Sequence, residues 1–263
     1  MKISIITPNY NGARFIEECV RSVHSQSGPG LEVEHIVIDG GSRDNSLEIL
    51  QRYRTGITQL ISEPDHGAAS AINKGLRLAT GEVIGWLNSD DRYCPGALAR
   101  VAAMMQAHPG KALCFGHCPI LNEAGLEIRK PITRFKELFF PFSSRFMIQS
   151  INYISQPAMF FRRTAFEAAG PLREDLRYAF DYEFILRLWR QGGGVHVPDG
   201  HLAGFRWHPG SLSGTGFVQQ FEEELDAALA DAGSHSVQGL MHRAVRWGIV
   251  TIYSRMAKPA ASG

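Results

Sequence analysis

Short apolar runs alternate with stretches of helical spacing through the first hundred residues. The runs 3–7, 34–39, 59–62 and 83–87 have the length and composition of buried strands. Between them, apolar residues recur at helical spacing, first at Ile16, Cys19, Val20 and Val23 and later at Ala69, Ile72, Leu76 and Ala79. This alternation predicts βαβ units and a mainly parallel sheet flanked by helices.

The pattern becomes irregular further along the chain. We predict strands over 112–120, 155–162 and 202–207, and helices over 163–169 and 182–189. The stretch 129–146 differs from these, because it mixes five basic residues with five phenylalanines and has no clean period. We expect it to be a mobile surface segment.

The C-terminal tail has its own charge pattern. No acidic residue follows Asp231, so the last 32 residues carry +4 and the rest of the chain carries −3. One side of a helical wheel holds Met241, Val245, Ile249, Ile252 and Met256, with Arg243 and Arg246 towards the other. The tail is either a helix packed on its own domain or a helix on an anionic membrane surface. We therefore divide the chain into a domain over 1–215 and a helical extension over 216–263.

Composition and charge narrow the class of protein. The chain has 263 residues, a net charge of +1 and 44% hydrophobic residues, which excludes disordered, collagen-like and disulfide-scaffold classes. Near-neutral charge argues against a dedicated nucleic-acid binder, because phosphate contacts require a basic face. No apolar run approaches the roughly 20 residues of a membrane-spanning helix. The N-terminal apolar run is too short for a secretory signal.

The four cysteines, Cys19, Cys94, Cys114 and Cys118, are irregularly spaced. A chain of this size needs no disulfide staples, so we interpret them as reduced thiols in a cytosolic protein. The cluster over 114–118 is a weak metal candidate, because no second pair of ligands accompanies it. A buried strand that contains cysteines is the simpler interpretation.

Polar residues stand at the ends of three predicted strands. Thr7 ends the first, Asp39 ends the second, and Asn88-Ser89-Asp90-Asp91 follows the fourth. In an open parallel sheet, ligands bind outside the carboxyl ends of the strands, so these residues should meet at one crevice. Two acidic points there suit a nucleotide, because one carboxylate can accept from a base or ribose and the other can hold a divalent cation against phosphates.

Five motifs in order extend this pattern. They are Thr7-Pro8-Asn9-Tyr10-Asn11, Val37-Ile38-Asp39-Gly40-Gly41-Ser42, Glu63-Pro64-Asp65 with Gly67, Asn73-Lys74-Gly75, and the run from Gly81 to Asp91. Over about residues 1–215 the chain resembles family 2 glycosyltransferases. The resemblance implies the GT-A fold, a Rossmann-like, mainly parallel twisted sheet flanked by helices, here with a C-terminal helical extension. It also implies an inverting, hexosyltransferase-type transfer of a sugar from a nucleotide-diphosphate sugar to an acceptor hydroxyl.

The resemblance implies a set of donor-binding residues, which are Thr7, Tyr10, Asp39, Asp65, Asn73, Lys74, Asn88 and Ser89. Among them, Thr7, Tyr10 and Asp39 would contact the base and ribose, and Asp65 would lie beside the donor. The sequence departs from the family pattern at two points. Asn88 replaces the first acid of the Asp-x-Asp metal motif, and Ser70 stands where many relatives have Asp.

Two later motifs complete the resemblance. Phe180-Asp181-Tyr182-Glu183-Phe184 resembles the family's catalytic acid motif at the start of a helix, with Asp181 as the base. Arg206-Trp207-His208 resembles the late motif whose His can complete the metal shell. Asp90, on the last acid of Asp-x-Asp, and His208 would then hold Mg²⁺ or Mn²⁺.

The leaving group suggests the mechanism. A glycosidase expels a poor alkoxide and needs two flanking carboxyl groups. A nucleoside diphosphate leaves more easily, and a cation can neutralise its charge, so one general base is enough. We expect Asp181 to take the acceptor proton as the hydroxyl attacks from the face opposite the diphosphate. The N-terminus of its helix should favour the ionised carboxylate by roughly 0.3–1 kcal/mol.

Two other functions stay open at this point. A sugar nucleotidyltransferase shares the sheet and the nucleotide site, but usually has a Gly-rich loop with a basic residue after strand one, whereas residues 8–14 contain one glycine. A sugar-nucleotide-binding homologue without activity is suggested by Asn88 and Ser70. Against it, Asp39, Asp90, Asp181 and His208 are all present.

The expected partners follow from the resemblance. The donor is a UDP-sugar, with GDP- and dTDP-sugars as alternatives, and the acceptor is a saccharide or lipid-linked. Such enzymes build bacterial surface polysaccharide, lipopolysaccharide or glycolipid, which places the chain in the cytoplasm, peripheral at the inner face of the membrane. The segment 129–146 and the cationic tail are candidates for membrane contact, and a lid over the donor is an alternative role for the segment. The oligomeric state is open.

Overall fold

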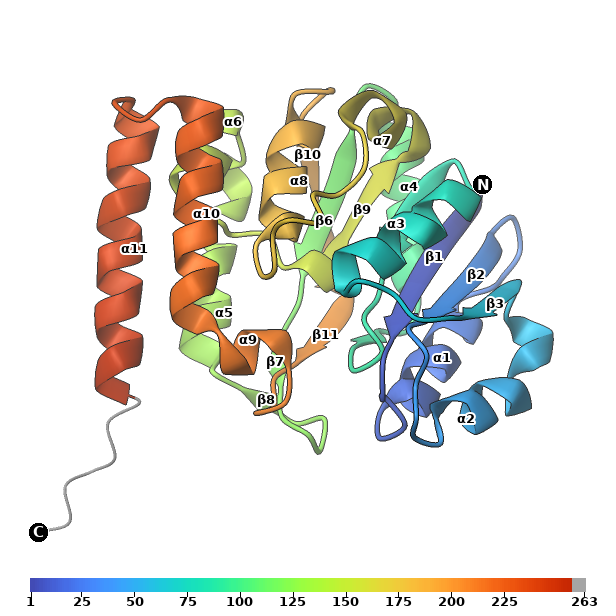
Figure 1. Ribbon diagram of the computed structural model, residues 1–263. Helices are drawn as coiled ribbons and strands as arrows, with labels where there is room; N and C mark the ends of the chain where they lie inside the picture. Colours follow the sequence, from blue (N-terminus) through green and yellow to red (C-terminus); the bar gives the residue numbers. More distant parts are fainter. Residues whose placement is uncertain (257–263) are drawn as a thin grey trace, which may run out of the picture.

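A computed structural model describes residues 1–256 and shows a twisted central sheet between layers of helices (Figure 1). The strand order is β10-β6-β9-β4-β1-β2-β3. Every neighbouring pair is parallel except for the two that include β9. The strands are β1 (Lys2–Asn9), β2 (Glu32–Asp39), β3 (Gln59–Ser62), β4 (Val83–Trp86), β6 (Leu113–His117), β9 (Met159–Arg162) and β10 (Gly194–His201). The predicted α/β class with a mainly parallel sheet is confirmed.

Helices cover both faces of this sheet, which explains why its central strands are apolar on both sides. On β1, Ile3 and Ile5 pack in one core cluster, while Ile6 packs in another. All four apolar positions predicted for the first helix are buried. The covering helices are α1 (Ile16–His24), α2 (Ser46–Arg52), α3 (Ala68–Leu78), α4 (Ala97–Ala107), α7 (Arg163–Ala169) and α8 (Phe180–Trp189), and the 3₁₀ turn η1 (Arg54–Gly56) follows α2.

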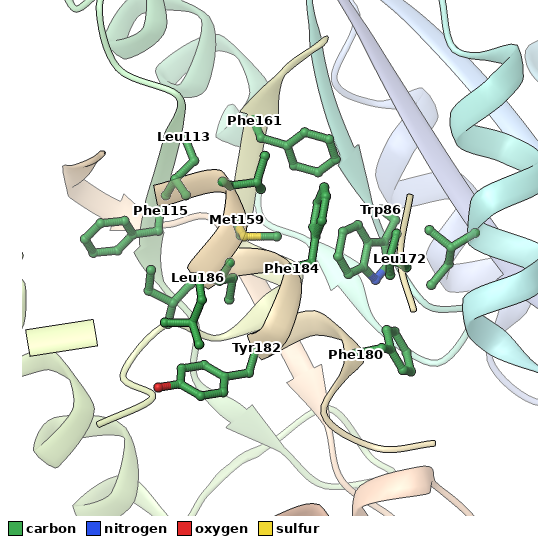
Figure 2. Packing of buried hydrophobic residues seen from close by; sticks show 14 of the residues in the cluster. Trp86, Leu113, Phe115, Met159, Phe161, Leu172, Phe180, Tyr182, Phe184 and Leu186 are labelled. Carbon is green, nitrogen blue, oxygen red and sulfur yellow. The ribbon is translucent and has the colours of Figure 1, made fainter. Parts of the chain in front are cut away.

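An aromatic core fixes α8 against the middle of the sheet. Trp86 of β4, Phe161 of β9 and Phe184 of α8 pack together, and the ring centroids of Phe161 and Phe184 are 5.1 Å apart (Figure 2). Aromatic pairs at such distances add to the free energy gained by burying their surface. The start of α8 is thereby held near the carboxyl end of β4.

A second, smaller sheet returns the chain to that same end. Its order is β5-β11-β7-β8, with bounds β5 (Arg92–Tyr93), β7 (Ile120–Leu121), β8 (Glu127–Ile128) and β11 (Ala203–Arg206). Strand β5 directly follows the 88–91 turn and pairs with β11. Residues 207 and 208, which follow β11, therefore lie beside the end of β4.

Three predictions for the middle of the chain were wrong. The segment 129–146 is not irregular, since it contains α5 (Lys130–Glu137), η2 (Phe140–Phe142) and the start of α6 (Arg145–Ser150). Its aromatic residues do not share one face: Phe140 is buried, while Phe142 is 69% exposed. The expected strand over 155–162 begins with the 3₁₀ turn η3 (Gln156–Ala158). Strand β10 was not predicted, because its second half, Pro198–His201, is polar and exposed.

The C-terminal part is helical as expected, with α9 (Leu212–Thr215), α10 (Phe217–Ala232) and α11 (Val237–Met256). Helix α11 packs on α10 and α6, but the predicted inward face was wrong in part. Met241 is 39% exposed, while His242 is 4% exposed and hydrogen-bonds through Nδ1 with the Gln149 carbonyl. The side chains of Ile252, Arg255 and Met256, and residue Lys258, lie outside the described residues. The division at residue 215 stays a prediction.

Candidate active site

Asp39 ends β2 as a fully buried carboxylate. Five donors bind it: Asn9 Nδ2 at 2.7 Å, the backbone N–H groups of Gly41 and Ser42, and the hydroxyls of Ser42 and Ser62. Burial alone would raise the pKa of Asp39, but these hydrogen bonds outweigh it and leave the pKa below its ordinary value. Asp39 therefore organises the loops after β1 and β2, and a nucleotide could bond to it only in exchange for one of these donors.

The other two residues predicted to contact the base and ribose differ in accessibility. Thr7 is fully buried, and a hydrogen bond of 3.0 Å joins its hydroxyl to His35 Nε2. Tyr10 is 62% exposed at the end of the same strand. The phenol of Tyr10 is thus available to a ligand at the surface. Thr7 is not, because its hydroxyl is bound to His35 of the neighbouring strand β2.

The predicted donor residues around α3 lie on the same side of the sheet. Asp65 lies against the end of β2, since a Cβ on Gly40 would come within 2.5 Å of Asp65 Oδ2. Lys74 forms an ion pair of 2.8 Å with Glu63 and is partly exposed. Asn73 is buried, and its amide exchanges hydrogen bonds with the backbone of Leu172. Asn73 therefore ties α3 to the 170–175 loop in this structure.

The turn after β4 is held by a buried arginine. Arg206 is 2% exposed; its Nε donates to the Asp90 carbonyl at 2.8 Å, and its Nη2 donates to Glu18. Its backbone N–H donates to Asp91 at 2.7 Å. Burial, with the charge of Asp90, raises the pKa of Asp91 well above its ordinary value. Arg206 thus fixes the register between the Asp90 turn and the end of β11.

Because of this register, Asp90 and His208 meet. A contact of 3.2 Å joins Asp90 Oδ2 to His208 Nε2, although 118 residues separate them in the chain. Asn88 and Ser89 flank Asp90 and are partly exposed, and Ser89 lies next to Gly12 of the loop after β1. The ends of β1 and β4 and the segment after β11 therefore come together at this edge of the sheet.

These two side chains fit a divalent cation by the chemistry of their donor atoms. Carboxylate oxygen suits Mg²⁺ and Mn²⁺, and imidazole nitrogen is a further ligand that Mn²⁺ accepts. Within residues 1–256, no group of three His, Cys, Asp or Glu side chains converges on one point. Asp90 and His208 would therefore be a partial ligand set that leaves coordination positions to oxygen atoms of a substrate.

Asp181 occupies the first turn of α8, as expected, but its surroundings differ from the prediction. Its Oδ1 accepts a hydrogen bond of 2.8 Å from the Tyr182 backbone N–H. Burial raises the pKa of Asp181 to about 6, and the backbone hydrogen bond and the charge of Lys136 oppose this only in part. Burial therefore acts against the stabilisation that the helix N-terminus was expected to give the ionised form. A carboxyl with this pKa is still mostly ionised at pH 7 and is a stronger base than an exposed one.

The surroundings of Asp181 include residues that the sequence did not indicate. Glu223 of α10 accepts hydrogen bonds from the backbone N–H groups of Tyr178 and Ala179, at 2.7 and 2.9 Å, just before α8. Glu224 and Lys136 interact electrostatically with Asp181. No local pattern marks these residues, because helices α5 and α10 place them beside α8 only through the tertiary fold.

The cysteines agree with the sequence interpretation. All four are free, and Cys19, Cys114 and Cys118 are buried. Burial raises the pKa of the Cys114 thiol to about 12, so this thiol is not a ready nucleophile.

Residues 4–170 match the family model described as Glycosyl transferase family 2. The chain is 34% identical over 189 residues to an uncharacterized glycosyltransferase of Mycobacterium tuberculosis, and the alignment covers 70% of this chain and 68% of the relative. It is 28% identical over 193 residues to a PGL/p-HBAD biosynthesis glycosyltransferase of Mycobacterium bovis, which covers 71% and 69%.

Solved structures share the fold. S. aureus TarS 1–349 in complex with UDP-GlcNAc aligns with a TM-score of 0.74 at 20% identity, over 98% of this chain and 76% of that one. The mannosyltransferase PcManGT from Pyrobaculum calidifontis, in complex with GDP-Man and Mn²⁺, aligns with a TM-score of 0.65 at 18% identity, over the same shares. In the longer TarS structure, the aligned part is 42% of that chain. These alignments confirm the GT-A fold.

Proposed function

The chain belongs to glycosyl transferase family 2, and on this premise we propose that it transfers a sugar from a nucleotide-diphosphate sugar to a hydroxyl of a saccharide or lipid-linked acceptor. The observation that carries the proposal is the Asp90–His208 contact of 3.2 Å at the carboxyl end of β4. Their meeting at the ligand-binding edge of the sheet supports a role in binding the donor diphosphate.

A bound Mg²⁺ or Mn²⁺, with Asp90 and His208 as its protein ligands, would neutralise negative charge on the departing diphosphate. The chain's own groups would hold the rest of the donor. Tyr10 offers an exposed ring and hydroxyl at the end of β1, and Asp65 and Lys74 lie along the same edge. A UDP-sugar is the donor we propose first, and GDP- and dTDP-sugars are the alternatives.

Asp181 is the general base in this proposal. Its ionised carboxylate accepts the proton of the acceptor hydroxyl as that oxygen attacks the anomeric carbon. The bond from the anomeric carbon to the diphosphate oxygen breaks on the opposite face, so the configuration inverts. One base is enough, because the diphosphate needs no proton to leave.

The cellular setting is part of the proposal. One relative named above is a glycosyltransferase of PGL/p-HBAD biosynthesis, and we propose a related role in bacterial surface polysaccharide, lipopolysaccharide or glycolipid synthesis. None of the helices within residues 1–256 has both the length and the apolar character needed to cross a bilayer. We propose that the chain works in the cytoplasm and touches the inner face of the membrane through the exposed apolar residues of α5, η2 and α6.

The first experiment measures donor binding and turnover. UDP-, GDP- and dTDP-sugars are screened by thermal shift with and without Mn²⁺, since a ligand of the folded state raises its apparent stability. We expect one nucleotide class to raise Tm in a Mn²⁺-dependent way. Asp181→Asn should keep this shift and lose roughly 10²- to 10⁴-fold in kcat. It should also be at least as stable as the parent at pH 7, because a buried charge is removed.

A matched control is Asp175→Asn. Asp175 lies in the loop before α8, is exposed and pairs only with Arg173 within the described part of the chain. Its variant should turn over like the parent. If Asp181→Asn turns over at the parental rate, Asp181 is not the base. Tight donor binding without hydrolysis or transfer by the parent would favour an inactive binding homologue.

A further inference from the structure

Glu224 of α10 is a buried carboxyl group close to the proposed base. It is 5% exposed. The charged and titratable groups that interact with it are Asp181 and Tyr182 from α8 and Lys136 from α5. Glu223, its neighbour on α10, acts on Asp181 and is bound to the backbone before α8. A buried carboxylate without a cation is costly, so the protonation state of Glu224 matters for the whole cluster.

The hydrogen bonds to Glu224 come from neutral amides. Gln220 Nε2 donates to Glu224 Oε1 at 3.2 Å, and Asn152 Nδ2 donates to the same oxygen at 3.4 Å. The nearest cation, Lys136, instead donates from Nζ to Ser155 Oγ at 3.3 Å. Among the residues described by the structure, no Lys, Arg or His nitrogen lies within 4.0 Å of the Glu224 carboxyl oxygens.

The side-chain amide of Asn152 donates to Glu224 through its nitrogen, but its oxygen lacks a hydrogen-bond donor within the described residues. That oxygen, Oδ1, is buried. An unsatisfied buried acceptor costs about 1–3 kcal/mol. A carboxylate has no proton to offer this oxygen, whereas a carboxylic acid has an O–H that can donate to it. A carboxylic acid and an amide can then exchange two hydrogen bonds, and both groups are satisfied.

We propose that Glu224 is a neutral carboxylic acid that donates its proton to Asn152 Oδ1, and that it acts as a positioning residue beside Asp181. The neutral state leaves the partly buried Asp181 as the anion that interacts with Lys136, while Glu223 is bound to backbone N–H groups. The effect on catalysis rests on the proposed role of Asp181, but the protonation state does not.

The electrostatics agree in direction with this assignment. Burial, reinforced by the charge of Asp181, raises the pKa of Glu224 to about 7, against an ordinary value of 4.5. A folded-state pKa above the unfolded value means that Glu224 supports stability fully below the unfolded pKa. That contribution falls as pH rises from about 4.5 to about 7 and stays lost above it. The ionised form would also place a second negative charge beside the base.

The test compares Glu224→Gln with the parent. Gln has the shape of the protonated acid, and its Nε2 can donate to Asn152 Oδ1. We expect equal stability at about pH 5 and a higher Tm for Glu224→Gln, by a few degrees, at about pH 8. The infrared spectrum of the parent at about pH 6.5 should contain a protonated-carboxyl C=O stretch that the variant lacks. Glu222→Gln, on the exposed side of α10, is the matched control and should keep that band.

The pH dependence of kcat/KM tests the charge of Glu224 independently. If Glu224 is neutral, Glu224→Gln changes no charge near Asp181, so the acid limb of kcat/KM stays in place. If Glu224 is ionised, the variant removes a like charge, and the limb moves to lower pH. A shifted limb, no difference in the infrared band, or a loss of stability at both pH values would each overturn the proposal. The infrared and stability results hold whether or not the chain proves to be a glycosyltransferase.

Discussion

At the scale of single residues, the site separates groups that hold the structure from groups that can reach a ligand. Asp39 and Thr7 are fully buried, and their polar atoms are engaged by protein partners. Tyr10, Asp90 and His208 have accessible surface at the same edge of the sheet. A strand-end position predicted where each residue would lie. It could not predict which of them has free hydrogen-bonding capacity, because this depends on serine residues from other segments.

His208 is the residue whose role is easiest to test alone. Replacing it with Ala removes one of the two ligands proposed for the cation and leaves Asp90 in place. We expect the Tm increase caused by Mn²⁺ plus donor to shrink, and the Mn²⁺ concentration for half-maximal activity to rise roughly 10- to 100-fold, which is the usual cost of weakening a metal site. The Tm of the ligand-free protein should change little, because His208 is partly exposed.

His235 supplies the comparison for this variant, because it is an exposed histidine between α10 and α11. His235→Ala should respond to Mn²⁺ like the parent. If His208→Ala also keeps the parental Mn²⁺ response, the cation is held elsewhere. The Asp90–His208 contact would then be only a hydrogen bond that holds the ends of β4 and β11 together.

At the scale of elements, helix α10 has a role that the family resemblance did not include. The family model ends at residue 170, yet Glu223 from α10 binds the backbone just before α8, and Glu224 lies beside Asp181. Close packing of this contact is visible at Gly216, where a Cβ would meet the Tyr178 ring at 2.1 Å. The C-terminal helices are therefore part of the structure around Asp181, the proposed base.

Glu223→Ala tests this coupling. The variant removes the acceptor of two short backbone hydrogen bonds, so the loop at 177–179 should loosen and Asp181 should lose its fixed position. We expect kcat to fall about 10-fold or more, with a smaller change in donor KM, because positioning errors reduce the rate of the chemical step. Hydrogen exchange at the Tyr178 and Ala179 amides should become faster.

Glu223→Gln keeps an oxygen acceptor and should restore most of the rate, while Glu222→Ala leaves these bonds intact and should behave like the parent. Donor KM rising as much as kcat falls would contradict a positioning role. So would unchanged exchange at the two amides, because the loop would then not depend on Glu223.

The sequence was informative about elements wherever the periodic pattern was strong. Strands β1, β2 and β4 and the four buried positions of α1 were predicted because apolar period and burial coincide there. Strand β3 was predicted from its short apolar run, although none of its residues is fully buried. Helix α5 was missed because its residues are mostly polar or exposed and only Thr133 is buried. The smaller sheet was missed because β5, β7 and β8 each have two residues. Such strands are defined by pairing with distant segments, which no local pattern records.

At the scale of the whole molecule, the segment from α5 to α6 and the helix α11 both combine exposed apolar and basic residues. Phe135, Leu138, Phe142 and Phe146 are each more than 40% exposed along α5, η2 and α6, and the same segment carries Arg134, which is exposed. On α11, Trp247 is 73% exposed and Arg243 is exposed. Because α11 packs against α6, these two segments lie at the same end of the molecule (Figure 1). Exposed aromatic and basic residues together favour an anionic lipid surface.

Vesicle binding tests this surface without removing a helix, which matters because α11 buries His242 and its deletion would expose the core. The double variant Leu138→Ser/Phe142→Ser removes two exposed apolar side chains. We expect its partition onto vesicles that contain anionic lipid to fall roughly tenfold, since partial burial of two such side chains is worth more than about 1.4 kcal/mol. Leu126→Ser, at an exposed leucine in the turn between β7 and β8, should bind like the parent.

Neutral vesicles and high salt should weaken binding by the parent, because the attraction between basic side chains and anionic lipid is screened by salt. Equal partition of the parent and the double variant would show that this face does not meet the membrane, and the acceptor would then have to reach Asp181 from solution.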